Sequence, residues 1–240
     1  MPRISWPAAA LNTSRTAAPI PALAEDAAQT LATFLAEPAK AASLGLSGAD
    51  VDRLADALSA SWSTQTGRSV SAAEYVALLQ RVHLHNALAL QDTSAPLPAS
   101  LVYPVLERVQ DTLTARPGWL AAPALRGYLQ PSRTRALRLD PEPAVLVDPL
   151  DELAYLTLEL DMLGRRWIGD RLREHYEADI DRPRCERLWA FYSTLRAAMA
   201  ARLLINDPDP SICANTRRSG ANAYLAIAER HSARFCPRTR

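Results

Sequence analysis

The chain has 240 residues, of which 48% are hydrophobic and 22% charged, values typical of a globular protein that buries a core without disulfides or metal. A formal net charge of +1 argues against wholesale attraction to nucleic acid or to an anionic membrane surface. No apolar run approaches the roughly 20 residues of a membrane span, and residues 1–21 lack the continuous apolar segment of a signal peptide. Three widely spaced cysteines without a Cys-x-x-Cys pair indicate free thiols, so we expect a cytoplasmic protein.

Helical periodicity dominates the chain. Apolar side chains recur at the 3.6-residue spacing in residues 21–38, 47–62, 71–90, 101–119, 149–163, 167–180, 184–205 and 220–235. Ser47 with Asp50, and Ser71 with Glu74, have the spacing of a capping box. Gly164 is suited to end the helix at 149–163.

One segment carries a β signal. Residues 135–148 read as two short strands around a proline-bearing turn, Asp140 to Pro143. The predicted fold class is therefore mainly α, with one β-hairpin at about residues 134–148. We expect residues 1–20 to be a loose lead-in and residues 21–240 to form a single, mostly helical domain.

Two segments resemble a known family. Residues 146–172 read LVDPLDELAYLTLELDMLGRRWIGDRL, and residues 188–204 read LWAFYSTLRAAMAARLL. Together with the helical segment from about residue 45, they resemble the C-terminal lobe of the aminoglycoside phosphotransferase-like, kinase-like family. The likeness is greatest to its bacterial branch, sometimes fused to a P-loop kinase. The resemblance covers roughly residues 45–205 and implies a kinase-like helical lobe.

The family places a His-Gly-Asp-Leu motif before the hairpin, where the aspartate accepts the proton of the substrate hydroxyl. The corresponding stretch here is Arg126-Gly127-Tyr128-Leu129, so Arg126 stands at the histidine position and Tyr128 at the base position. A phenol with a pKa of about 10 stays protonated at neutral pH, whereas a carboxylate with a pKa of about 4 is ionised. Loss of a general base typically costs roughly 10²–10⁴ in rate. The resemblance thus implies a catalytic loop without its catalytic base.

The resemblance also suggests a metal position. Asp148 ends the second predicted strand, where the family's Mg²⁺-binding aspartate would lie, and Asp140 in the turn is a weaker metal ligand candidate. An alternative interpretation is that Asp148 caps the following helix, because Pro149 occupies the preferred first helical position. The capping interpretation is the favoured one.

A kinase-like enzyme also needs an N-terminal β lobe with a phosphate-covering loop and a lysine. The chain has eight glycines in no Gly-x-Gly-x-x-Gly pattern, and Lys40 is its single lysine. We therefore expect no N-terminal β lobe and no cofactor. The leading hypothesis is a catalytically degenerate pseudoenzyme that serves as a binding or scaffolding module for a protein partner. Two alternatives stay open: a small-molecule phosphotransferase using ATP and Mg²⁺, with a partner chain supplying the nucleotide lobe, and a generic helical interaction domain.

The remaining polar patterns favour structural roles. His83 and His85 are two residues apart, a spacing that places them on different sides of a helix and argues against a shared metal. The acidic run of Asp151, Glu152, Glu159 and Asp161 predicts a solvated helix face, with an ion pair between Asp161 and Arg165. Residues 211–240 hold six arginines against one acid, but lack the interleaved aromatics of a nucleic-acid platform, so we do not expect nucleic-acid binding.

Overall fold

The computed structural model describes residues 46–63, 70–92, 97–131, 146–179, 184–207, 209 and 211–235. Its elements are α3 (Gly48–Ser63), α4 (Ala72–Leu90), α5 (Ala99–Ala115), α6 (Pro117–Leu120), α7 (Ala122–Leu125), β1 (Gln130–Pro131), β2 (Leu146–Val147), α8 (Pro149–Met162), α9 (Arg166–Asp179), α10 (Glu186–Ile205) and α11 (Ala214–Phe235). The mainly helical prediction is confirmed. Three predictions concern residues that the structure does not describe. They are the helix at 21–38, the absence of an N-terminal β lobe, and Asp140 as a metal ligand.

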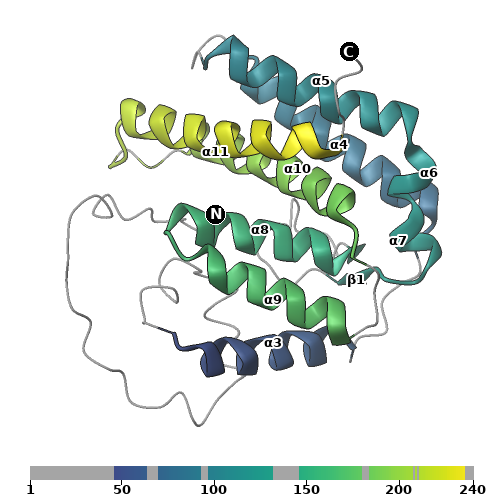
Figure 1. Ribbon diagram of the computed structural model, residues 1–240. Helices are drawn as coiled ribbons and strands as arrows, with labels where there is room; N and C mark the ends of the chain where they lie inside the picture. The colour runs from purple at the N-terminus through teal and green to yellow at the C-terminus, as the bar shows by residue number, and fades with distance from the viewer. Residues whose placement is uncertain are drawn as a thin grey trace.

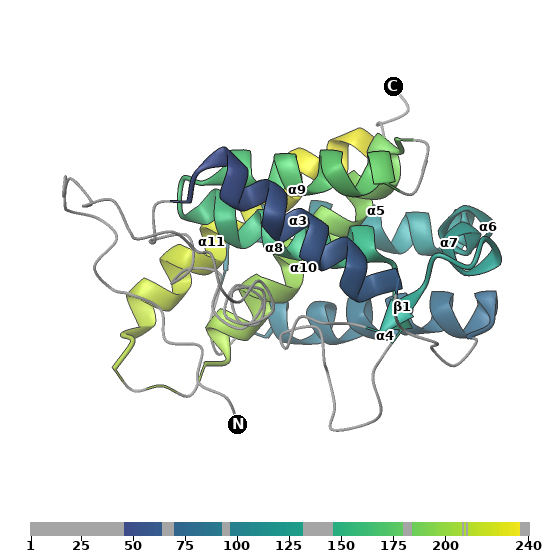
Figure 2. The same ribbon diagram turned by 90° about the horizontal axis from the view of Figure 1, so that it is seen from below.

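The helices pack around α10 (Figure 1). It contacts α4, α5, α8 and α11, while α9 lies between α8 and α3. Seen from below, α3 lies in front of α8 and α9, and α4 runs along the lower edge of the view (Figure 2). Because α10 is surrounded, its residues are buried on all sides, among them Leu188, Phe191, Tyr192, Leu195 and Met199.

Several helices begin and end where local chemistry predicts. Ser71 Oγ accepts a hydrogen bond from the Glu74 N–H at 3.2 Å, and the Glu74 carboxylate accepts one from the Ser71 N–H at 2.8 Å. Ser47 and Asp50 make the same reciprocal pair before α3. Gly164 follows α8 with φ +70°, which confirms the predicted helix end.

The predicted hairpin is confirmed in part. β1 and β2 pair antiparallel, with Gln130 opposite Val147 and Pro131 opposite Leu146. β2 lies inside the predicted second strand, but β1 begins before residue 134, ahead of the predicted hairpin. The predicted first strand and turn belong to residues 132–145, outside the described part of the chain.

Two sequence predictions about side chains were wrong. Asp151 and Glu152 have no exposed surface, so the first turn of α8 is not a solvated face. Asp161 pairs with Arg166 at 3.8 Å instead of Arg165, because the chain turns at Gly164 and only re-enters a helix at Arg166. His83 is buried and His85 exposed, as their spacing predicts.

Candidate functional site

The segment predicted as a degenerate catalytic loop forms the end of helix α7. Gly127 has φ +71°, and its N–H donates to the Ala124 carbonyl at 3.1 Å. The Tyr128 N–H donates to the Pro123 carbonyl at 2.9 Å. These two bonds make a Schellman motif, in which the left-handed residue is normally glycine. A Cβ on Gly127 would meet nothing within 4 Å, so the glycine is required by its backbone conformation.

The β1–β2 pairing brings the two sequence-predicted site segments together. Tyr128 and Leu129 directly precede β1, and Asp148 directly follows β2. Because the strands are antiparallel, the start of β1 lies beside the end of β2. Arg126 is exposed and Tyr128 partly buried, whereas Asp148 has no exposed surface.

Asp148 is the N-cap of α8. Its Oδ1 accepts a hydrogen bond from the Leu150 N–H at 3.0 Å, which satisfies one of the unpaired donors of the first turn. Its Oδ2 accepts a second bond, from the Tyr192 hydroxyl at 3.1 Å. The capping interpretation of Asp148 is therefore confirmed, and its carboxylate faces the core.

Two tyrosines continue this network into the core. The hydroxyls of Tyr75 on α4 and Tyr192 on α10 lie 2.9 Å apart. Burial, together with the carboxylates of Asp148 and Asp151, raises the pKa of both phenols well above the ordinary value. Both hydroxyls therefore stay protonated, so Tyr192 donates to Asp148 and Tyr75 donates to Tyr192.

The next two acids on α8 have partners on other helices. Arg196 of α10 binds both carboxylate oxygens of Asp151, with Nε 2.7 Å from Oδ1. The two side chains are 2% and 1% exposed. Trp62 of α3 donates its Nε1–H to Glu152 Oε2 at 3.1 Å. The three acids around the start of α8 thus join α3, α4, α8 and α10 in one buried polar network.

Sequence reasoning missed Arg196, Tyr192, Tyr75 and Trp62 as partners of this network. A signal was present for Arg196: it stands in the middle of a helix whose neighbouring residues are almost all apolar. An arginine is almost never fully buried unless it is paired, so an arginine at a core position of such a helix predicts a buried partner of opposite charge. Nothing in the sequence around Arg196 identifies Asp151 as its partner.

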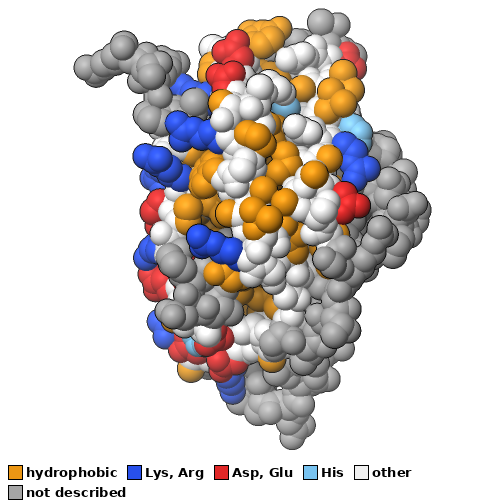
Figure 3. Space-filling model, turned by 90° about the vertical axis from the view of Figure 1, so that its right-hand side faces the viewer, with side chains coloured by type: hydrophobic (Ala, Val, Ile, Leu, Met, Phe, Trp, Pro, Cys, Tyr) orange, Lys and Arg blue, Asp and Glu red, His pale blue; other side chains and the backbone are white. Residues whose placement is uncertain are grey.

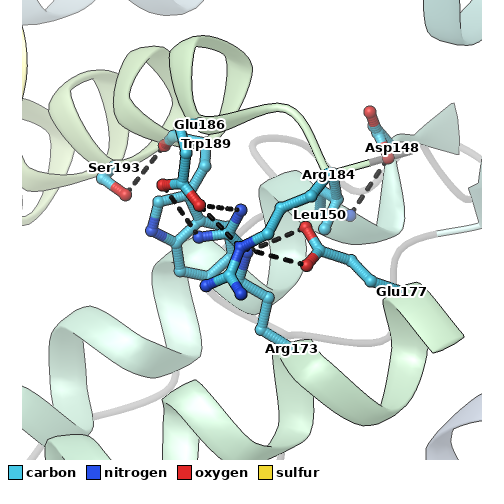
Figure 4. A network of polar contacts seen from close by, with 8 residues as sticks. All are labelled: Asp148, Leu150, Arg173, Glu177, Arg184, Glu186, Trp189 and Ser193. Atoms are coloured by element: carbon cyan, nitrogen blue, oxygen red, sulfur yellow. Dashed lines mark hydrogen bonds and ion pairs between the residues drawn. The ribbon is translucent and has the colours of Figure 1, made fainter. Parts of the chain in front are cut away.

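A second network fixes α9 against the start of α10 (Figure 4). The guanidinium of Arg173, 5% exposed, donates to Glu177 at 2.9 Å and to both Glu186 oxygens at 3.1 and 3.3 Å. It also lies 4.3 Å from the ring centroid of Trp189. Arg184 donates to Glu186 at 2.7 Å and completes the cluster. This network anchors both ends of the α9–α10 connection.

Neither network has the composition of a metal centre. Within the described residues, no three His, Cys, Asp or Glu side chains are grouped so that they could hold a metal ion. No described helix combines the length and apolar character needed to cross a membrane. Comparison of the chain with known protein families, curated proteins and solved structures found no match.

Proposed function

We propose that the protein is a catalytically inactive binding or scaffolding module, built on a helical domain related to the C-terminal lobe of phosphotransferase-like kinases. The observation that carries the proposal is the environment of Asp148, the predicted metal ligand. It is fully buried, and its two oxygens accept hydrogen bonds from Leu150 and Tyr192. Binding of Mg²⁺ there would break the cap of α8 and the bond to α10, so the carboxylate serves the fold.

The position of the missing base supports the same proposal. Tyr128 follows a Schellman helix end whose geometry is complete without a ligand. A phenol is a poor base at neutral pH, and a tyrosine side chain is bulkier than the aspartate that the family has at this position.

Exposed apolar side chains support a partner-binding role. Leu125, immediately before the Schellman turn, is 73% exposed, and Leu84 and Leu88 on α4 are 54% and 65% exposed. Apolar side chains gather over the middle of the face that carries α6 and α7 (Figure 3). Apolar side chains that gather on one face of a protein are typical of a protein-binding site, so we assign the partner to the face around Leu125.

Calorimetry with Mg-ATP tests the inactive part of the proposal. We expect no binding heat for the native chain, because the described residues include no lysine-bearing β lobe and Asp148 is held by Leu150 and Tyr192. Binding at micromolar concentration would overturn the proposal. The Arg171→Met variant, changed at an exposed position on α9, controls for nonspecific attraction of the triphosphate to surface arginines.

One observation favours the active alternative, a small-molecule phosphotransferase. The β1–β2 pairing sets the Tyr128 segment beside Asp148, as base and metal ligand would be arranged in an enzyme. The alternative predicts that Tyr128→Asp gains ATP-dependent phosphoryl transfer. Flat assays for the native and variant chains, with and without a partner chain, would remove its support.

Photo-crosslinking tests the binding part of the proposal. A photoreactive phenylalanine replaces Leu125 in cells that express the protein naturally. We expect a single prominent crosslinked protein, identified by mass spectrometry. The same residue placed at exposed Glu107 on α5 is the matched control. Equal and unselective crosslinking at both positions would contradict a binding face around Leu125.

A further inference from the structure

Helix α11 carries an unbalanced positive charge. Its arginines are Arg217, Arg218, Arg230 and Arg234, and its only acid is Glu229. The Arg217 guanidinium donates to two backbone carbonyls. The other three arginines are exposed, and no acid in the described part of the chain lies within ion-pair distance of them. Helix α11 therefore presents cations to solvent that the fold does not neutralise.

Two of these cations are placed where they weaken the helix. Arg230 and Arg234 are one turn apart, and side chains at this spacing are neighbours on a helix surface, where like charges repel. The helix dipole favours Arg234, which lies in the last turn, but this effect fades before Arg230. Sequences break local rules of this kind mainly at functional sites. The stability of α11 thus does not explain the pair.

A third arginine approaches the same turn from another helix. Arg166, at the start of α9, lines one small cavity together with His231, which follows Arg230 in α11. Burial of the imidazole, followed by repulsion from the guanidinium groups of Arg234, Arg166 and Arg230, lowers the pKa of His231 to about 4. All three charges therefore lie close to one imidazole. We call Arg166, Arg230 and Arg234 the α9–α11 basic surface.

The acids beside this surface narrow the class of its partner. Asp161 and Asp170 pair with Arg166, at 3.8 and 3.3 Å, and both stay partly exposed. Their carboxylates would repel the continuous row of phosphates of a nucleic acid. An acidic peptide carries separate carboxylates, and each of these can meet one unpaired guanidinium in a bidentate contact. The pattern of charge therefore favours a protein partner.

We infer that the α9–α11 basic surface binds an acidic segment of a partner protein, whose carboxylates pair with Arg230 and Arg234. Complementary charge of this kind gives specificity and faster association. The inference does not rest on the proposed partner face around Leu125, because α7 carries that residue.

Fluorescence anisotropy tests the inference with a fluorescein-labelled peptide of alternating glutamate and serine, at low ionic strength. We expect saturable binding to the native chain, and binding about fivefold or more weaker for the double variant Arg230→Gln/Arg234→Gln. Added salt should weaken binding to the native chain, because exposed charge pairs are screened. No saturable binding to the native chain, or equal binding to the variant, would overturn the inference.

Arg81→Gln/Arg116→Gln is the matched control. It removes two exposed arginines from α4 and the end of α5, for which no ion pair exists within the described residues. The net charge changes equally, so equal losses in the two double variants would show attraction without a site and overturn the inference. A labelled single-stranded oligonucleotide should bind the native chain more weakly than the peptide does. Tighter binding of the oligonucleotide would assign the surface to nucleic acid instead.

Stability separates a binding role from a structural one. Arg230→Gln relieves the repulsion within α11 and leaves Arg234 at the helix end, so its urea midpoint should equal or exceed that of the native chain. A lowered midpoint would assign Arg230 to the fold and overturn the inference. Charge reversal gives a second readout: Arg230→Glu/Arg234→Glu should bind the corresponding peptide of lysine and serine, which the native chain should not bind. Binding of that peptide to the native chain would also overturn the inference.

Discussion

The ion pair between Asp151 and Arg196 is expected to behave as a buried charge pair whose partners cannot be removed singly. Both side chains are almost inaccessible, at 1% and 2% exposure, and both carboxylate oxygens are bound by the guanidinium. Arg196→Met leaves the buried carboxylate of Asp151 without its counter-charge, and Asp151→Asn leaves the buried guanidinium of Arg196 without its counter-charge. Each single change should cost about 3–5 kcal/mol of unfolding free energy.

The double variant Asp151→Leu/Arg196→Met should recover most of that loss. It removes both charges and fills the space with apolar atoms, and such replacements of buried pairs are often neutral or stabilising. Arg196→Met should also regain stability as pH falls, because the raised pKa of the isolated carboxyl lets Asp151 take up a proton in the folded state. Asp151→Asn has no such group and should not respond in this way.

Urea unfolding at pH 7, followed by tryptophan fluorescence and circular dichroism, measures these effects. The exposed pair between Asp52 and Arg171 is the matched control, with side chains 38% and 48% exposed and a bidentate contact at 2.5 and 2.7 Å. Its coupling should be small and should fade with added salt, whereas the coupling between Asp151 and Arg196 should persist. Equal couplings for the two pairs, or a double variant as unstable as the sum of the singles, would refute the reasoning.

Two further predictions concern helix contacts of α8. Burial raises the pKa of Glu159, whose carboxylate accepts from Tyr224 at 3.1 Å, from 4.5 to about 7. The native chain therefore loses stability as the pH rises from 4.5 to 7. Glu159→Gln should be more stable than the native chain at pH 8, by up to about 3 kcal/mol, and nearly as stable as the native chain at pH 4. Urea titrations across pH, with exposed Glu107→Gln as control, would contradict this if the two variants had the same profile. Gly169→Ala should destabilise by about 1–3 kcal/mol, because its Cβ would lie 2.7 Å from Thr157 Cβ. A Cβ at Gly118 would meet no atom within 4 Å, so Gly118→Ala should lower the unfolding free energy far less. Similar thermal midpoints for the two alanine variants would count against the close approach of α9 to α8.

The parts of the fold that could be predicted from sequence depend on neighbours along the chain. Apolar spacing located the long helices, but it merged α5 with α6, missed the short helix α7 and began α11 six residues late. The Ser71–Glu74 capping box and Gly164 located helix ends, because caps are made by residues within a few positions. The family resemblance, which no comparison supports, placed Gly127 in a predicted catalytic loop. The backbone instead explains that glycine by the end of α7.

The parts that could not be predicted depend on how helices distant in the sequence pack against one another. Sequence placed Asp151 and Glu152 in a first turn, where carboxylates favour the helix dipole, and such residues are usually solvated. Only the packing of α10 and α3 over that turn buries them and supplies Arg196 and Trp62 as partners. Hydrogen bonds within a turn are fixed by local spacing, whereas burial of a charge requires a partner that lies 45 or 90 residues away in the chain. Local sequence thus predicts the long helices and several of their ends, whereas the packing of the helices places the acids at the start of α8 in contact with α3, α4 and α10.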